Sequence, residues 1–154
     1  MRVLQDENVF TDGLTRYKVE GQHGSNDAYA VPPVAERLGD ACGLVFTHHD
    51  EQTLYIAGDT VWVKPYLKAL QRFEPDVVVL NIGDAHIDEF GPIIMGAQDT
   101  LRTLQVLPSA TLVASHMEAI NHCLLSRQAL REFTQQQGIA DRVAIPEDGE
   151  SLTF

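Results

Sequence analysis

The strongest constraint on the fold is a set of short apolar runs that each stop at a small or polar residue. Residues 54–60 form such a run and end on Gly58-Asp59-Thr60, residues 76–80 form a second, and residues 110–115 form a third that is followed by His116. Runs of apolar β-formers with this ending are typical of strands that meet loops. A carboxylate and an imidazole would then lie at the ends of neighbouring strands, which predicts a metal site in an α/β protein.

The order of the runs predicts a mixed β-sheet. The first strands follow one another as hairpins, with a polar turn at 48–52, and the later strands alternate with amphipathic helices whose ends are marked by Pro75, Pro108 and Ser126. Hairpins followed by helix and strand in alternation give a mixed sheet with helices on at least one face. We expect strands at 14–20, 43–47, 53–57, 77–80, 111–115, 143–145 and 151–154, and helices at 65–73, 96–107 and 126–138.

Length and charge narrow the class of protein. The 154 residues are enough for one domain, 1–154, with a core of its own. The formal net charge of −11 would repel nucleic acid. No apolar run is long enough for a membrane span, and residues 1–6 turn acidic too early for a secretory leader, so we expect a cytoplasmic protein. Cys42 and Cys123 are read as two reduced core thiols.

Three residues are candidate metal ligands: His23 in a Gly-rich loop, Asp59 and His116. Neutral imidazole and carboxylate suit zinc, iron or manganese. Each residue also has a simpler explanation. Asp59 could cap its own turn, and His116, like His122, could be a core histidine packed under the last helix.

The remaining histidines are weaker candidates. His48 and His49 lie in a turn beside Asp50 and Glu51, which favours a solvated pair over a pair of ligands. His86 lies in the loop after a buried-looking strand and is kept, with His122, as a secondary candidate for the site.

Four stretches carry a resemblance that covers nearly the whole chain: 54–62, 75–83, 92–99 and 114–123. They resemble the second half of metal-dependent hydrolases of the metallo-β-lactamase superfamily, near its lactonase-like branch. The resemblance implies half of a four-layer αββα sandwich, with a mixed β-sheet and helices on one face. It also implies that His23 binds a first metal, that Asp59 bridges two metals and that His116 binds the second.

The sequence departs from the family pattern in one respect. The family's richest metal motif, His-x-His-x-Asp-His, belongs upstream of His23, and the residues before His23 contain no histidine. The resemblance therefore implies a truncated protein that retains the C-terminal half of the family fold. With His23, Asp59 and His116 alone, we expect zinc, manganese or iron to bind weakly, at about one ion per chain at most, because affinity depends on the number of ligands.

Three functions remain open. The first is a hydrolase of esters, lactones or phosphodiesters whose site is completed by dimerisation or by a chain that carries the N-terminal half. The second is a non-catalytic module that binds a small ligand or acts as a scaffold. The third is a gene fragment without a selected role. Because a half-sandwich leaves one apolar sheet face exposed to solvent, we expect a homodimer or a complex with the complementing half.

Overall fold

The computed structural model describes residues 6–118 and 121–154. The residues at 1–5 and 119–120, two of which fall in the last of the matching stretches, lie outside the described part. The elements are β1 (Glu7–Val9), β2 (Thr15–Glu20), α1 (Asn26–Tyr29), α2 (Pro32–Leu38), β3 (Cys42–His48), β4 (Glu51–Ile56), α3 (Lys64–Phe73), β5 (Val77–Asn81), β6 (His86–Ile87), β7 (Gly91–Pro92), α4 (Ala97–Val106), β8 (Thr111–Ser115), α5 (Arg127–Gln136), a 3-10 turn (Ala140–Arg142) and β9 (Val143–Ala144).

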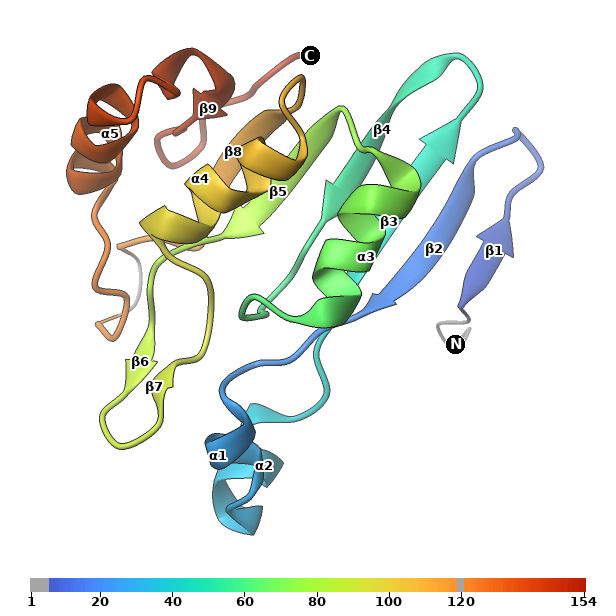
Figure 1. Ribbon diagram of the computed structural model, residues 1–154. Coiled ribbons are helices and arrows are strands. Elements are labelled where there is room, and N and C mark those ends of the chain that lie inside the picture. The colour runs from blue at the N-terminus through green and yellow to red at the C-terminus, as the bar shows by residue number, and fades with distance from the viewer. Residues whose placement is uncertain (1–5, 119–120) are drawn as a thin grey trace.

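The main sheet has the strand order β1-β2-β3-β4-β5-β8-β9 (Figure 1). Strands β1 to β4 are antiparallel neighbours, whereas β4, β5, β8 and β9 pair in parallel, so the predicted mixed α/β sheet is confirmed. The three parallel strands β4, β5 and β8 end at one edge of the sheet. Strand β2 ends at the same edge, because it is antiparallel to β3 and β3 is antiparallel to β4.

The main helices begin and end where local chemistry satisfies their backbone. The Ser126 hydroxyl accepts a hydrogen bond from the Ala129 N–H at 3.1 Å and caps α5, as the sequence predicted. The Asp99 carboxylate does the same for the Gly96 N–H at 3.1 Å at the start of α4. Helix α3 ends at Glu74, whose φ of 41° is left-handed, immediately before Pro75.

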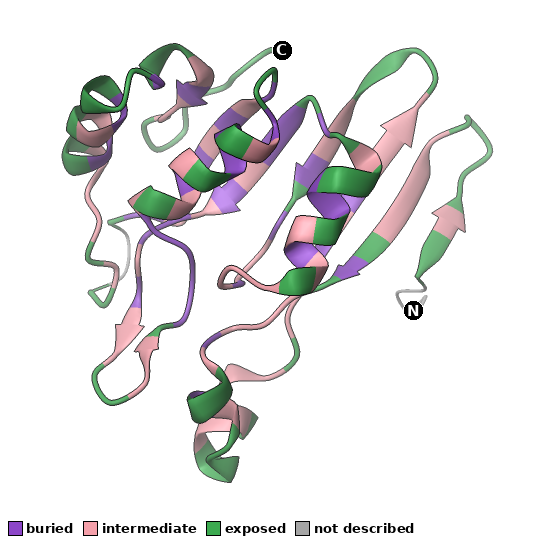
Figure 2. Cartoon of the chain, viewed as in Figure 1, coloured by how far each residue is buried: buried purple, intermediate pink, exposed green. Residues whose placement is uncertain are grey.

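The core lies between the sheet and one layer of helices. Figure 1 shows α3 and α4 crossing the same face of the sheet, and Figure 2 shows buried positions on the strands beneath them. Tyr55, Leu80 and Leu112 point from the strands toward Leu70 and Leu104 of the helices, all at most 2% exposed. Burial of such side chains stabilises the fold by about 1.5–3 kcal/mol each.

Near the start of α3, the single tryptophan of the chain joins two helices. The Trp62 ring meets Tyr66 edge-on with centroids 5.2 Å apart, and the Arg102 guanidinium of α4 lies 4.0 Å from the Trp62 ring centroid. Stacking of a guanidinium on an indole is a favourable contact. The loop that follows Asp59 is thereby attached to both α3 and α4.

The opposite face of the sheet is apolar, and Figure 1 shows none of the described helices crossing it. Since side chains alternate along a strand, Leu44, Ile56, Val79 and Val113, which lie side by side in register, point away from the core. They are half-buried or, for Ile56, 37% exposed. Within the described residues, none of them belongs to the two clusters of core side chains. We call this surface, together with Phe46 and Leu54, the open sheet face.

Most predicted elements are confirmed to within two residues, and the last one is wrong. Residues 151–154 form no strand, because β9 pairs with β8 only through Leu112–Val143 and Val113–Ala144 before the chain leaves the sheet at Pro146. The sequence analysis also missed β1, the β6–β7 hairpin and the helices α1 and α2. Pro32 is the first residue of α2, where a missing N–H costs nothing. No helix within the described residues is long and apolar enough to span a membrane.

A buried hydroxyl pair gives a test of this core. Tyr66 is 0% exposed and its hydroxyl lies 2.8 Å from the Thr103 Oγ1, which donates to the Asp99 carbonyl at 2.8 Å. Tyr66 must therefore donate to Thr103, and burial raises the pKa of Tyr66, so that the phenol stays protonated. We expect Tyr66→Phe to lower the free energy of unfolding by about 1–2 kcal/mol.

Urea denaturation followed by circular dichroism measures this change. Tyr17→Phe, at a half-buried ring on β2, is the matched control and should alter stability less. Equal stability of Tyr66→Phe and the parent chain would contradict the proposed contribution of the hydroxyl pair.

Candidate metal centre

Asp59 follows β4 in a turn that only a glycine can begin. Gly58 has a φ of 69°, and a Cβ on it would lie 2.7 Å from the Cys42 carbonyl oxygen. The Asp59 Oδ1 accepts a hydrogen bond from the Asn81 side-chain amide, at 2.7 Å. This bond runs across to the end of β5 and not to the backbone of the turn, so within the described residues the carboxylate is oriented by the neighbouring strand.

His23 lies in the loop after β2, and its imidazole is held in one tautomer. The His23 Nδ1 lies 3.3 Å from the Leu38 carbonyl oxygen, and the His23 backbone N–H donates to the Tyr29 hydroxyl at 3.2 Å. A carbonyl can only accept, so Nδ1 carries the proton and the Nε2 keeps its lone pair. Metal-binding histidines usually have this arrangement, with the second nitrogen donating to a carbonyl or carboxylate.

Two hydrogen bonds tie the loop of His23 to the loop of Asp59. The Gln22 N–H donates to the Thr60 Oγ1 at 2.9 Å, and the Val61 N–H donates to the Gln22 carbonyl at 2.9 Å. Thr60 is 1% exposed, so its hydroxyl is a buried link between the two loops. The residues next to the two candidate ligands are therefore fixed relative to one another.

His116 follows β8 and has a strained backbone. Its φ of 58° is left-handed, a conformation that costs a non-glycine residue about 1–3 kcal/mol and that clusters at functional sites. The loop also needs Gly83, two residues after β5, because a Cβ there would lie 2.3 Å from the His116 carbonyl oxygen. Asn81 and Ser115 are register partners, so Asp59, Asn81 and His116 occupy adjacent strand ends.

An ion-pair cluster centred on Arg127 holds the loop that contains His116. The Arg127 guanidinium binds Glu118 and Asp148 and donates from Nε to the Pro146 carbonyl at 2.8 Å, while the Arg127 backbone N–H donates to the Glu118 Oε1 at 2.9 Å. These hydrogen bonds hold the pKa of Glu118 below its ordinary value. The Arg127 side chain is 15% exposed and, with His116 and Asp148, lines a hollow of about 160 Å³.

Cys123 lies next to the same strand ends. Its thiol lies 3.7 Å from the His116 carbonyl oxygen, and burial, followed by the charge of Asp59, raises the pKa of the Cys123 thiol. The thiol is therefore protonated at neutral pH. Cys42 and Cys123 are both free, as the sequence predicted.

The structure brings the three predicted ligands to one edge of the sheet but not into one tight cluster. Within the described residues, the one group of three side chains with ligand atoms all within 4.8 Å is His48, His49 and Asp50, at the other end of the sheet. The assignment of the ligands stays a prediction.

The secondary candidates, His86 and His122, flank an antiparallel bridge between Ala85 and Cys123. His86, in β6, contacts the Asp84 carboxylate through Nε2 at 3.0 Å, and His122 is exposed in the turn after the loop of His116. Sequence reasoning missed Asn81 and Arg127. Asn81 carried the same signal as Asp59, a polar residue at the end of an apolar run, whereas the Arg127 cluster joins segments that are distant in sequence.

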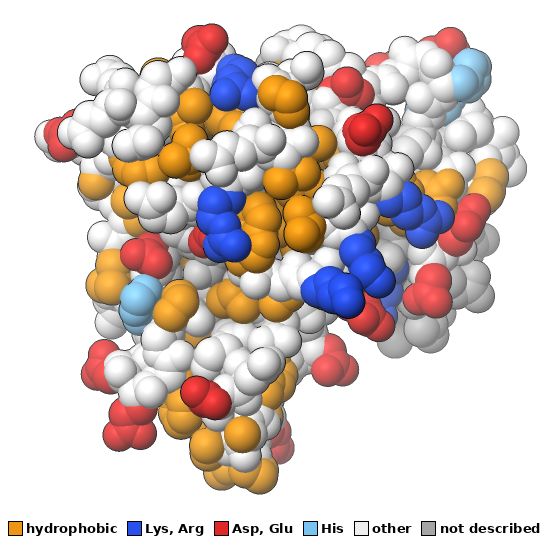
Figure 3. Space-filling model, viewed as in Figure 1, with side chains coloured by type: hydrophobic (Ala, Val, Ile, Leu, Met, Phe, Trp, Pro, Cys, Tyr) orange, Lys and Arg blue, Asp and Glu red, His pale blue; other side chains and the backbone are white. Residues whose placement is uncertain are grey.

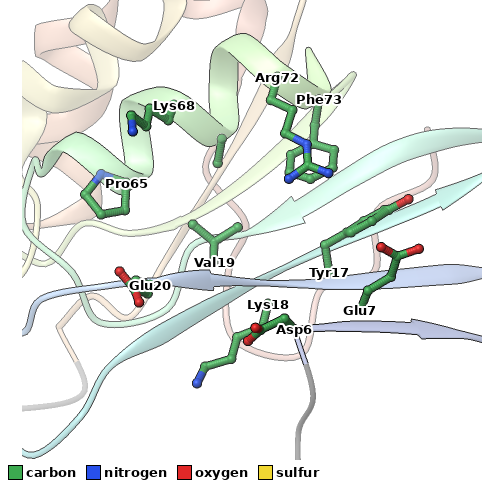
Figure 4. A pocket seen from close by; sticks show the side chains of 11 residues that line it. Asp6, Glu7, Tyr17, Lys18, Val19, Glu20, Pro65, Lys68, Arg72 and Phe73 are labelled. Atoms are coloured by element: carbon green, nitrogen blue, oxygen red, sulfur yellow. The ribbon is translucent and has the colours of Figure 1, made fainter.

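A separate hollow of about 350 Å³ lies between β2 and α3. Figure 4 shows Arg72 reaching over Tyr17 and Phe73, with its guanidinium carbon 5.5 and 4.7 Å from the two ring centroids. Lys18, Lys68 and several carboxylates line the rest of it, and no candidate histidine does. It is distinct from the edge that carries Asp59.

Comparison with known proteins supports the fold and the partial length. No family model matches the chain. The UPF0173 protein YddR of Bacillus subtilis (strain 168) is 38% identical over all 154 residues, which are 58% of its own length. The chain therefore spans little more than half of this curated relative.

Solved structures also match nearly the whole of this chain and only part of their own chains. An isothiocyanate hydrolase from Delia radicum gut bacteria is 67% identical, with a TM-score of 0.97 over 99% of this chain and 60% of that one. A possible metal-dependent hydrolase from Veillonella parvula DSM 2008 is 42% identical, with a TM-score of 0.95 over 99% of this chain and 58% of that one. A metallo-β-lactamase fold protein from Bacillus subtilis, at 11% identity and a TM-score of 0.63, shows the shared fold. The chain therefore has the metallo-β-lactamase fold, and it is similar to somewhat more than half of proteins described as hydrolases.

Proposed function

We propose that this chain carries one part of the active site of a metal-dependent hydrolase, with His23, Asp59 and His116 as metal ligands. The observation that supports this most is the shared strand-end edge, where the Asp59 carboxylate is oriented by Asn81 and His116 follows the adjacent strand. Two relatives that match 99% of the chain at 67% and 42% identity are described as hydrolases.

The donor atoms fit a transition metal. The Nδ1 contact with the Leu38 carbonyl leaves the His23 Nε2 to coordinate. Asn81 donates to one oxygen of Asp59, and the second oxygen would coordinate the metal. Imidazole and carboxylate together suit zinc, manganese or iron. A bound ion of this kind would supply the Lewis acidity that polarises the substrate.

The chain's other residues would position these ligands. Asn81 would fix the carboxylate of Asp59, the Thr60 hydroxyl would keep the loops of His23 and Asp59 together, and Arg127 would hold the loop of His116 through Glu118. Support of this kind keeps ligands in the geometry that a metal requires before it binds.

The substrate class that we propose is an organic isothiocyanate, R–N=C=S. The support is the 67% identity to an isothiocyanate hydrolase across 99% of this chain. In the balanced reaction the oxygen of water bonds to the central carbon, the C–N bond breaks and the nitrogen gains two protons, so that R–NCS and H₂O give R–NH₂ and COS. Esters, lactones and phosphodiesters are the alternative substrates.

We further propose that residues 1–154 on their own have an incomplete site. Three ligands divided between two ions leave each ion with about half of a working coordination shell, and a group that orients the attacking water is also needed. The remaining 42% of the length of YddR would supply these groups, from the same polypeptide or from a second one. A non-catalytic role in ligand binding or as a scaffold is the alternative if reconstitution never yields turnover.

The isolated chain should be nearly inactive toward isothiocyanates. We expect negligible amine release from residues 1–154 with added zinc, manganese or iron, and strong release when a chain corresponding to the other part of a relative is co-expressed. Asp59→Asn and His116→Ala should each abolish the reconstituted activity. Reconstituted turnover that survives both substitutions would remove these residues from the site.

Metal affinity should depend on the amide that orients Asp59. We expect the strand-end edge of the isolated chain to bind about one zinc ion or fewer, and Asn81→Ala to weaken this binding about 10- to 100-fold, as loss of a supporting hydrogen bond does at other metal sites. Calorimetric titration measures both quantities. Gln105→Ala, an exposed amide on α4, is the control and should bind as the parent does. Tight binding of two ions at the strand-end edge of the isolated chain would contradict the incomplete site.

The open sheet face should make the isolated chain self-associate. We propose that in the isolated chain this face packs against a second copy, and that in the reconstituted protein it packs against the complementing part. Light scattering should give about twice the 17.1 kDa of one chain. Ile56→Lys should shift the mass to a monomer, whereas Val9→Lys, at an exposed residue of edge strand β1, should not. A monomeric parent chain would overturn the dimer.

A further inference from the structure

We propose that the turn between β3 and β4 forms a second cation site, made of His48, His49 and Asp50 and specific for a zinc, nickel or copper ion. One ligand atom of each residue lies within 4.8 Å of the other two, and within the described residues no other such trio is found. Two imidazoles and one carboxylate are the donors that these ions prefer. The proposal is independent of the hydrolase site.

An irregularity in the hairpin brings the two rings together. The register of β3 and β4 shifts between Phe46 and His48, so that strict alternation of side chains ends before the turn. The rings of His48 and His49 lie with centroids 4.3 Å apart. The His49 Nε2 lies 2.9 Å from the Asp50 Oδ2, so an imidazole nitrogen and a carboxylate oxygen already converge.

A neighbouring turn holds His48 in place. The His48 Nε2 lies 3.0 Å from the Asp12 carbonyl oxygen, in the turn between β1 and β2, and Gly13 packs so closely that a Cβ on it would lie 3.3 Å from that nitrogen. The carbonyl must accept, so the lone pair is on Nδ1, where the Asp50 N–H is 3.2 Å away. A metal would replace this long hydrogen bond while the contact with Asp12 orients the ring.

The surroundings favour a cation. A hollow beside the turn is lined by Asp12, His48 and Glu51, so further carboxylates lie near the trio, and the chain has a net charge of −11. The side chains of His49 and Asp50 are 74% and 71% exposed, which leaves coordination positions open to water. Figure 3 shows histidine at the surface at this end of the molecule. We expect binding weaker than in a closed four-ligand zinc site.

The trio is separate from the candidate hydrolase site. It lies at the amino end of β4, whereas Asp59 follows the carboxyl end, and the six residues of β4 at about 3.3 Å each put about 20 Å between the two. In Figure 1 the β3–β4 turn and the α1–α2 segment lie at opposite ends of the molecule. An ion bound at the turn is therefore not one of the ions proposed for His23, Asp59 and His116.

Calorimetric titration with nickel or zinc tests the proposal. The protein used as background carries three substitutions, His23→Ala, Asp59→Asn and His116→Ala, and so lacks the ligands proposed for the hydrolase site. We expect this background to bind one ion, and His48→Ala or His49→Ala to weaken the binding at least tenfold. His122→Ala and Asp88→Asn, at exposed residues elsewhere, are the matched controls and should leave the affinity unchanged.

Ring resonances of the histidines in NMR spectra give a second measurement, because addition of nickel should broaden those of His48 and His49 before those of His86. Circular dichroism establishes that each variant is folded. The proposal is overturned if the folded background binds no ion, or if its binding survives the loss of both His48 and His49.

Discussion

The parallel pairing of β4, β5 and β8 is the constraint on which the candidate site depends. Backbone hydrogen bonds align these strands so that Tyr55, Val78 and Leu112 are side by side in the core, and the same alignment places the residues that follow each strand at one edge. A slip of one residue between two strands would turn every core side chain to the opposite face. The burial of the core therefore also fixes the position of Asp59 relative to Asn81 and His116.

Sequence patterns predicted the parts of the fold that rest on local rules. Strands 77–80 and 111–115 and the helix after Ser126 were found because period, capping and proline positions act over a few residues. Helices α1 and α2 were missed, since they are short and are stabilised by contacts such as the Tyr29 hydroxyl with the Gly39 carbonyl at 2.7 Å. The strand expected at 151–154 failed for the converse reason, because a β-prone run forms a strand only where a neighbouring strand offers unpaired backbone groups.

The candidate site was predicted by residue type but not by its supporting contacts. His23, Asp59 and His116 were named from strand endings and from the family resemblance, while the tautomer of His23 and the link through Thr60 depend on how distant loops meet. His48 and His49 were interpreted as a solvated pair, and the structure shows them half-buried and exposed, respectively, in a turn where three ligand atoms converge. Whether neighbouring polar residues form a site depends on the geometry of the hairpin, which the order of residues does not reveal.

The position of Trp62 gives the molecule an internal optical reporter. This residue is the only tryptophan of the chain, lies three positions after Asp59, and has the Arg102 guanidinium 4.0 Å from its ring centroid. A cation against an indole changes the energy of the excited state, so the emission of the ring depends on where that cation lies. A ligand that moves the loop of Asp59 would change this distance. The wavelength of the tryptophan fluorescence would then shift, without any attached dye.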